Sequence, residues 1–422
     1  MKRMKIIVAL ILAACLIPGM AMAELKLAKH IDSLKLKGDL RVRFERHDQD
    51  KDANNAPGTE DTNNPKDRLR SRFRLGAFWK APDEKWEVGA GLCTGKHSST
   101  STNDTWSYRE SAKKSETFDS GDLRLDYAYA KHSLNIAGLK KANIILGQQK
   151  NPFQTSWLLW DSDVRPAGFT GHADFGMAFV TLGVYDFIQN DNDLGMMTAL
   201  QAGAKIKNGN ISFLGALTGY FYNNTPFLDD GGPPYDFEYL KDANGDYILD
   251  ADDRKIPVSW DDSTEYKYNI IDLYGKVDIA VDKKVKISPY IQLFTNIGAD
   301  GDKGEGYLPG DLEPDSENMG WVLGVKAKIN KASFKLSYAQ VGADSCIPDL
   351  KNADFGSSLN DGVNVKGAVV ALGYKITKHF STELTAYLYE PLTDEAIYTE
   401  DGLRKTDQRN MSMYHIDMKY KF

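Results

Sequence analysis

Residues 68–75 read Arg-Leu-Arg-Ser-Arg-Phe-Arg-Leu, so arginine occupies every second position. Alternate side chains of a β-strand point to opposite faces, and this stretch therefore places four guanidinium groups opposite Leu69, Phe73 and Leu75. A charged face backed by an apolar face is the pattern of a strand that lies between water and an apolar phase. Residues 34–45 repeat the pattern, with apolar and charged side chains in alternation.

The same two-residue period returns along most of the chain. It recurs in residues 86–92, 123–129, 285–293 and 321–329. A soluble β-sandwich also alternates in this way, so the period by itself does not decide the class of fold.

The lengths of the connections separate the two classes. Short polar links occur at 81–84, 208–209, 282–284, 330–331 and 377–379. Long polar segments rich in Gly, Asp and Asn lie at 46–66, 96–120, 150–165, 223–264, 298–317, 343–362 and 391–410. Short turns at one end of the strands and long loops at the other are typical of a transmembrane β-barrel. Soluble domains rarely carry so many loops longer than about 15 residues.

The alternation of short and long connections also fixes the number of strands. An antiparallel arrangement requires residues 166–188 to form two strands, divided at 174–176. The prediction is then an all-β, 16-stranded antiparallel transmembrane barrel (range 14–18), with seven short periplasmic turns and eight extracellular loops. Both termini are expected on the periplasmic side.

The C-terminal segment 414–422 has the pattern of an amphipathic strand up to its last residue. Apolar residues alternate with polar ones in Tyr414-His-Ile-Asp-Met-Lys-Tyr-Lys-Phe422. The last strand must pair with the first, because an open sheet edge is not tolerated in lipid. A terminal aromatic resembles the signal read by the outer-membrane assembly machinery. That machinery is thus an expected partner through Phe422, together with outer-membrane lipid and lipopolysaccharide.

The N-terminus resembles a cleaved export signal. Lys2, Arg3 and Lys5 precede an apolar run at 6–17, and Ala21-Met22-Ala23 has the small-x-small form of a cleavage site. The predicted organisation is a signal peptide at 1–23, a short periplasmic segment at 24–33 and a barrel at 34–422. An alternative places a lipoprotein box at Leu12-Ala-Ala-Cys15.

Composition excludes several classes of function. The remaining chain has no run of 18 apolar residues and hence no predicted transmembrane helix. Removing the signal removes three positive charges and no acid, which takes the formal net charge from −7 to −10 and argues against nucleic acid as a partner. Cys93 and Cys346 are too few for a disulfide scaffold, although a single bridge between them remains open.

Residues 147–168 read GQQKNPFQTSWLLWDSDVRPAG. This stretch resembles the G-x-x-K-N-P-F … L-L-W-D-S-D-x-x-P-x-G pattern of the putative-porin family of Gram-negative outer-membrane proteins. Residues 123–129 (LRLDYAY) and 36–43 (LKGDLRVR) are also similar to it. The resemblance implies a single-domain barrel that forms a water-filled channel, and it supplies no substrate.

If the apolar faces meet lipid, the charged faces line the interior. The residues predicted to line the pore are Arg41, Arg43, Arg68, Arg70, Arg72, Arg74, Arg124 and Asp126. Arginine on the lipid face would cost about 2–4 kcal/mol at the midplane of the membrane, which supports the assignment of the arginines to the interior. One hypothesis is a positive wall that concentrates anions. The other is that these arginines pair with carboxylates for structural reasons.

The loop at 150–165 is a candidate constriction that folds into the pore. Its candidate residues are Trp157, Trp160, Asp161, Asp163 and Arg165. Alternatively, the tryptophans belong to an interfacial aromatic girdle. Better girdle candidates are the aromatic residues near strand ends on the apolar faces, namely Trp79, Trp86, Tyr127, Tyr129, Tyr414 and Tyr420.

One acidic segment has the spacing of a calcium loop. Its candidate oxygen ligands are Asp242, Asn244, Asp246, Asp250 and Asp253. Tyr247 occupies the position where such loops have glycine, and an acidic hydrated external loop is the alternative. No other cofactor is predicted.

Sequence motifs of catalysis are absent: there is no H-x-x-x-H pair, G-x-S-x-G elbow or glycine-rich phosphate loop. The sequence therefore predicts a non-enzymatic outer-membrane porin for passive diffusion of small hydrophilic solutes, with an arginine-rich wall that is expected to favour anions. Two alternatives stay open, a substrate-specific channel and a binding or adhesion barrel that acts through its long loops. A homotrimer is a further possibility.

We predict that the mature protein begins at Glu24, because cleavage follows Ala23. Intact-mass analysis of protein purified from outer membranes measures this directly. A lipid-modified Cys15 at the mature N-terminus would contradict the assignment and support the lipoprotein box.

Overall fold

The computed structural model describes residues 33–49, 66–80, 85–95, 100–106, 122–189, 194–223, 268–299, 318–343, 345–357, 362–392, 397–399, 402–404 and 410–422. These ranges contain no α-helix, and none of their helical segments is long and apolar enough to cross a membrane. A 3₁₀ turn forms at Pro348–Leu350. The predicted signal peptide and the predicted calcium loop lie outside the described residues.

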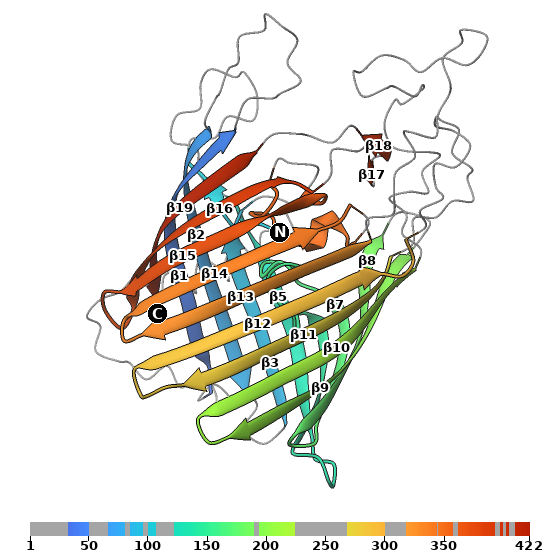
Figure 1. The fold of residues 1–422 in the computed structure, drawn as a ribbon. Helices are drawn as coiled ribbons and strands as arrows, with labels where there is room; N and C mark the ends of the chain where they lie inside the picture. The colour runs from blue at the N-terminus through green and yellow to red at the C-terminus, as the bar shows by residue number, and fades with distance from the viewer. Residues whose placement is uncertain are drawn as a thin grey trace, which may run out of the picture.

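Sixteen antiparallel strands form the wall of a closed barrel (Figure 1). They are β1 (Lys35–Gln49), β2 (Lys66–Lys80), β3 (Trp86–Thr94), β5 (Leu123–Leu134), β6 (Lys141–Gln148), β7 (Ala167–Asp174), β8 (Ala178–Gln189), β9 (Leu194–Asn208), β10 (Ile211–Asn223), β11 (Asn269–Ala280), β12 (Val285–Asn296), β13 (Met319–Ile329), β14 (Ala332–Val341), β15 (Val365–Lys375), β16 (Phe380–Pro391) and β19 (Met411–Lys421). The two-residue β4 (Asp104–Thr105) adds to β2, and β17 (Ile397–Thr399) pairs with β18 (Gly402–Arg404).

Each wall strand pairs with its neighbours in chain order, and β19 closes the ring against β1. The backbone of Phe422 exchanges two hydrogen bonds with Gly38, at 3.0 and 3.1 Å, so pairing runs to the last residue. Residues 175–177 form the short turn between β7 and β8, where the strand count required a division. The predicted sixteen-stranded antiparallel barrel is confirmed.

The outer surface of the barrel is apolar. Leu40, Leu217 and Leu323 are each about half exposed, whereas the inward-pointing Arg41 and Arg43 are buried. Large apolar side chains that alternate with buried charges fit a wall in contact with hydrocarbon. The predicted phase of β1 and β2, with arginines inside, agrees with this arrangement.

In β5, the prediction of which side chains face lipid and which face the interior is wrong for part of the strand. The register between β3 and β5 shifts at Gly91/Leu92, so that Gly91 opposes Tyr127 while Leu92 opposes Leu125. This β-bulge inserts Asp126 as an extra residue and reverses the faces on either side of it. Tyr127 is therefore buried and stacks on Phe78, at 5.9 Å between ring centroids, instead of joining an outer girdle.

The prediction that Tyr129 joins the outer girdle is wrong for the same reason. Its hydroxyl donates a hydrogen bond to Glu87 at 3.1 Å, and its ring lies against Gly89. Tyr414 and Tyr420, in contrast, are exposed on the outer surface of β19. The single inserted residue explains why alternation alone misplaced the two tyrosines, since a shift of one position exchanges the two faces.

We predict that Gly38→Ala weakens barrel closure by about 1–3 kcal/mol, because a Cβ atom there would overlap the ring of Phe422 and the carbonyl oxygen of Arg74. Gly215→Ala in β10 is the matched control, since a Cβ atom there meets nothing within 4 Å. Urea unfolding followed by gel mobility of the folded form measures both variants. Equal stability of the two variants would show that the seam tolerates the added methyl group.

Candidate functional site

Seven arginines project into the barrel from β1, β2 and β5, and we call them the arginine wall. They are Arg41, Arg43, Arg68, Arg70, Arg72, Arg74 and Arg124. The register sets Arg41 directly opposite Arg72, and Arg43 directly opposite Arg70. Like charges in this position repel one another, so the wall requires carboxylates nearby to be stable.

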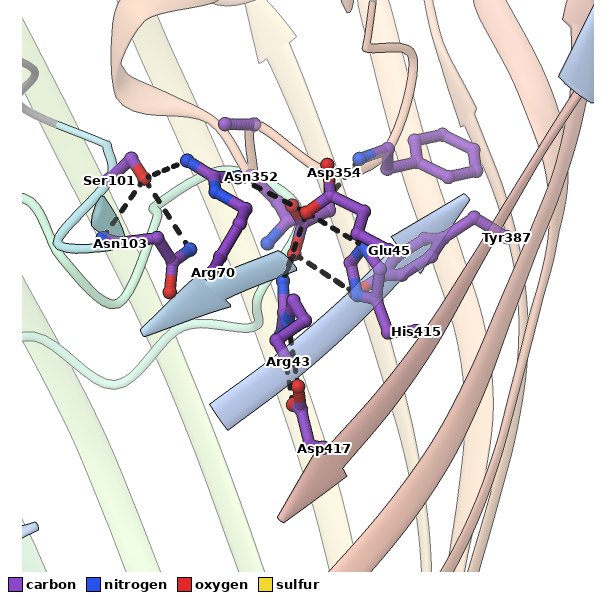
Figure 2. Close-up of polar contacts among 12 residues, drawn as sticks. Arg43, Glu45, Arg70, Ser101, Asn103, Asn352, Asp354, Tyr387, His415 and Asp417 are labelled. Carbon is purple, nitrogen blue, oxygen red and sulfur yellow. Dashed lines mark hydrogen bonds and ion pairs between the residues drawn. The ribbon is translucent and has the colours of Figure 1, made fainter. Parts of the chain in front are cut away.

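Three carboxylates, two on β1 and one on β19, bind five of the seven arginines, and two of the three, Glu45 and Asp417, are drawn in Figure 2. Arg43 binds Asp417 of β19 with two hydrogen bonds, at 2.7 and 3.0 Å. Arg72 binds Asp39 at 2.6 and 3.1 Å. Glu45, which is fully buried, accepts hydrogen bonds from Arg68 at 2.8 Å and from Arg70 at 3.1 Å.

Two histidines complete the cluster around Glu45. His47 Nε2 lies 2.9 Å from Glu45, and His415 Nε2 lies 3.6 Å from it. Sequence reasoning did not single out His415 or Asp417 as site residues. The signal that could have identified them is the alternation of the last strand, which places both on its inward face beside β1.

The segment 149–166, between β6 and β7, lies inside the barrel. Phe153, Leu158 and Trp160 are buried there among inward-pointing aromatic residues, and Phe153 packs edge-on against Tyr185 and Tyr220. Burial of these side chains favours the infolded position, because each large apolar side chain contributes about 1.5–3 kcal/mol when removed from water.

Polar contacts fix the segment to the opposite wall. The backbone N–H of Gln154 donates to Gln201 of β9 at 2.8 Å, and Gln201 Nε2 returns a hydrogen bond to the Gln154 carbonyl at 3.0 Å. Gln292 of β12 donates to Thr155 at 2.6 Å. The paired amides satisfy backbone groups that would otherwise be buried without partners.

The two tryptophans of the segment are interior residues. Trp157 Nε1 donates to the hydroxyl of Tyr290 at 2.9 Å, and Lys335 Nζ lies 4.4 Å from the Trp157 ring centroid. Trp160 is buried against Tyr220, at 6.0 Å between ring centroids. The alternative that places these tryptophans in an interfacial girdle is therefore wrong.

The charged residues of the segment face the arginine wall. Asp163 pairs with Arg74 and accepts hydrogen bonds from the backbone and the hydroxyl of Thr102, at 3.1 and 2.8 Å. Arg165 lies 2.8 Å from Asp126, the residue that the bulge inserts. Burial alone would raise the pKa of Asp163, but the guanidinium groups of Arg74 and Arg72 and the Thr102 hydroxyl hold it well below its usual range.

Asp161 joins this segment to a second infolded segment, 345–357. Its backbone N–H donates to the Leu350 carbonyl at 2.7 Å, and its side chain accepts from the backbone N–H of Ala353 at 3.3 Å and from Asn352 at 3.4 Å. Burial, together with the nearby negative charge of Asp163, raises the pKa of Asp161 to about 7. Two carboxylates two residues apart thus have opposite pKa shifts.

Segment 345–357 also reaches the arginine wall. Asp354 lies 3.5 Å from Arg43 and accepts a hydrogen bond from the Tyr387 hydroxyl at 3.4 Å (Figure 2). Lys351 is buried and donates to the carbonyl of Asn352 at 3.0 Å, and burial lowers its pKa to about 8. The segment therefore links the charged wall to the apolar wall formed by Tyr387 and its neighbours.

A third segment, 100–106, covers the arginine wall. Ser101 accepts from Arg70 at 3.3 Å through its hydroxyl and from Arg124 at 2.7 Å through its carbonyl. Thr102 accepts from Arg74 at 2.7 Å, and Asn103 accepts from Arg41. Two predicted constriction residues are thus in direct contact with predicted pore-lining residues, Asp163 with Arg74 and Arg165 with Asp126. The arginines hold three segments inside the barrel.

A cavity of about 310 Å³ remains beside segment 149–166. It is lined by Arg124 and Asp126 of β5, by Trp160 and Arg165 of the segment, and by Tyr185 of β8, among others. The cavity lies between the infolded segment and the wall, near the strand ends that are joined by the long loops.

The described part of the chain contains no group of three or more His, Cys, Asp or Glu residues suited to a metal ion. The predicted calcium ligands Asp242, Asn244, Asp246, Asp250 and Asp253 lie outside that part, so the calcium loop stays a prediction. Cys93 and Cys346 are both buried and free, which leaves no bridge between them.

Comparison with known proteins finds a matching family model and several similar solved structures. A family model described as "Putative porin" matches residues 43–237. Those residues include the second half of β1, all of β2 to β10, most of the arginine wall and the infolded segment 149–166. No curated protein matches the sequence.

Among solved structures, a triple mutant of the Rhodopseudomonas blastica porin is similar at 9% identity, over 92% of this chain and 100% of that chain, with a TM-score of 0.41. The outer-membrane expressed OmpT of Vibrio cholerae is similar at 11% identity, over 92% of this chain and 97% of that chain, with a TM-score of 0.45. The barrel itself is established by the strand pairings described above.

We predict that the contact between the two infolded segments weakens as the pH rises through about 7. The pKa of Asp161 is raised in the folded state, so its stabilising contribution is fully present below the ordinary aspartate pKa and is lost as the carboxyl group ionises. Channel recordings at pH 6 and pH 8 should show more current noise at pH 8. Asp161→Asn, which cannot ionise, should remove the pH dependence.

Recordings with identical noise at the two pH values in the unmodified protein would contradict the role of Asp161. Asp349→Asn is a control in the same region, since it removes a carboxyl group from segment 345–357 and leaves Asp161 unchanged.

Proposed function

We propose that this protein is a porin, a water-filled channel for passive diffusion of small hydrophilic solutes through the outer membrane of a Gram-negative bacterium. The observation that carries the proposal is a closed sixteen-stranded barrel with an apolar exterior, a charged interior and a connecting segment, 149–166, folded inside it. Barrels of sixteen to eighteen strands are wide enough to enclose an aqueous channel. The match of the family model to residues 43–237 supports the same function.

Segment 149–166 is the constriction of this channel in our proposal. It is tied to the arginine wall through Asp163 and Arg74, and to the opposite wall through Gln154 and Gln201. A segment held at both sides of the barrel narrows the passage. Its charged and aromatic side chains would then set the size and chemistry of the solutes that pass.

A non-enzymatic role fits this arrangement, because the buried charges of the interior are engaged in structural ion pairs. Asp39, Glu45 and Asp417 each bind arginine. Catalytic acids and bases need access to a substrate, which these buried pairs do not offer. Export through a cleaved signal peptide and insertion by the assembly machinery belong to the same proposal.

A substrate-specific channel is the second candidate. The observation that favours it is the apolar cluster formed by two infolded segments with strands β8–β16 and β19, which removes much of the interior from the passage. A narrow remaining path discriminates between solutes more strongly than a wide one. A solute that blocks ion current at micromolar concentration would identify this candidate, whereas general diffusion predicts no such block.

We predict that the purified protein forms ion-conducting channels in planar lipid bilayers, and that Asp163→Asn increases the single-channel conductance. The substitution removes the ion pair with Arg74, and breaking a buried pair costs about 3–5 kcal/mol of the free energy that holds the segment in place. The freed segment would then obstruct the pore less.

Asp48→Asn is the matched control, because Asp48 pairs with Arg46 on the outer side of β1, at 3.0 Å, where both side chains are partly exposed. Its conductance should equal that of the unmodified protein. Absence of any conductance would refute the porin, and an unchanged conductance in Asp163→Asn would refute the constriction.

A further inference from the structure

The half of the interior nearest the short turns carries a second group of cations, on strands β11 to β14. We call it the lysine patch, and it comprises Lys276, Lys286, Lys326, Lys328 and Lys335. Apolar side chains at alternate positions of these strands, such as Leu323 and Leu336, are exposed on the outer surface. The lysines therefore point inward, as the alternation of a strand requires.

The register of these strands places lysines directly opposite one another. Lys286 opposes Lys328 in the β12–β13 pair, and Lys326 opposes Lys335 in the β13–β14 pair. Direct cross-strand pairs of like charge destabilise a sheet. This arrangement lowers the stability of the sheet, and it creates a positive electrostatic potential inside the barrel.

Carboxylates compensate only part of the patch. Asp278 lies 3.0 Å from Lys276 and 3.3 Å from Lys286, and it is the acid that these two lysines share. Within the ranges that the structure describes, Lys326, Lys328 and Lys335 have no carboxylate within ion-pair distance, and acids act on two of them only from farther away: Asp278 on Lys326, and Glu383 and Asp354 on Lys335. The patch therefore has one carboxylate, Asp278, within ion-pair distance of its five lysines, whereas six carboxylates lie within 4.0 Å of the seven arginines of the wall: Asp39, Glu45, Asp126, Asp163, Asp354 and Asp417.

The patch lies next to the proposed constriction. Lys335 Nζ is 4.4 Å from the ring centroid of Trp157 in segment 149–166. Lys326 Nζ is 5.3 Å from the ring centroid of Tyr290, whose hydroxyl accepts the hydrogen bond from Trp157. A solute that passes the segment toward the short turns would thus meet these ammonium groups, two of which, Lys326 and Lys328, are exposed inside the barrel.

We propose that the lysine patch makes the channel selective for small inorganic and organic anions, and that it does so in place of the arginine wall. Uncompensated cations along a narrow, low-dielectric passage raise the local concentration of anions and lower that of cations. This inference rests on the proposed porin function and adds a substrate class and the residues that select it.

The experiment measures the reversal potential in planar bilayers under a potassium chloride gradient. The unmodified protein should pass chloride in preference to potassium. K326Q/K328Q should lower the chloride-to-potassium permeability ratio at least about twofold, because two uncompensated charges are removed from the passage. Both side chains are exposed in the interior, so the barrel should still fold, which gel mobility of the folded form verifies.

Two further variants separate charge from other effects. K326R/K328R keeps both charges and should keep the selectivity of the unmodified protein. K283Q/K284Q removes two exposed lysines from the turn between β11 and β12 and should change the ratio much less, although the change in net charge is the same.

The outcomes distinguish the inference from the function on which it rests. A protein that conducts but is cation-selective, or whose ratio is equal in K326Q/K328Q and K283Q/K284Q, overturns the lysine patch and leaves the porin standing. A protein that does not conduct at all overturns the porin. Loss of selectivity in K326Q/K328Q with retention in K326R/K328R supports the inference.

Discussion

The ion pair between Arg43 and Asp417 joins the first strand of the barrel to the last, and much of the interior depends on it. A barrel must close, because unpaired strand edges are not tolerated in lipid. Closure brings β19 beside β1 and sets Asp417 opposite Arg43. Breaking such a buried pair costs about 3–5 kcal/mol, since the remaining charge is left without compensation. The seam is therefore held by side chains as well as by backbone pairing.

The same arginine also faces the interior segments. Arg43 lies 3.5 Å from Asp354 of segment 345–357, and Arg74 pairs with Asp163 of segment 149–166. Carboxylates from the loops and from neighbouring strands share one set of guanidinium groups. The physical consequence is that the arginine wall acts mainly as a docking surface. Charge that is used to hold protein segments is not available to attract solutes, which is why we assign anion selectivity to the lysines of β13 and β14.

Sequence reasoning reached most of the fold and about half of the candidate site. Strand alternation, the alternation of short and long connections and the amphipathic terminus at Phe422 predicted sixteen strands. The predicted division at 174–176 lies one residue from the turn observed at 175–177. Strand alternation assigned Tyr127 and Tyr129 to the wrong face, because the inserted residue Asp126 shifts the two-residue period and nothing in the local sequence marks a bulge. Sequence reasoning named Arg74 and Asp163 separately but could not pair them, since 89 residues separate the two in the chain.

Outside the bulge in β5, the sequence by itself determined which side chains face lipid and which face the interior, because that choice is local and follows from the two-residue period of a strand. It also determined that the chain closes on itself, since a terminal amphipathic strand requires a partner. Only the tertiary structure decided which charges are neutralised. Lys326 and Arg43 look alike in sequence, each on the polar face of an amphipathic strand. Their difference arises from neighbours brought together by cross-strand register and infolded segments: Arg43 meets Asp417 and Asp354, whereas Lys326 meets Lys335.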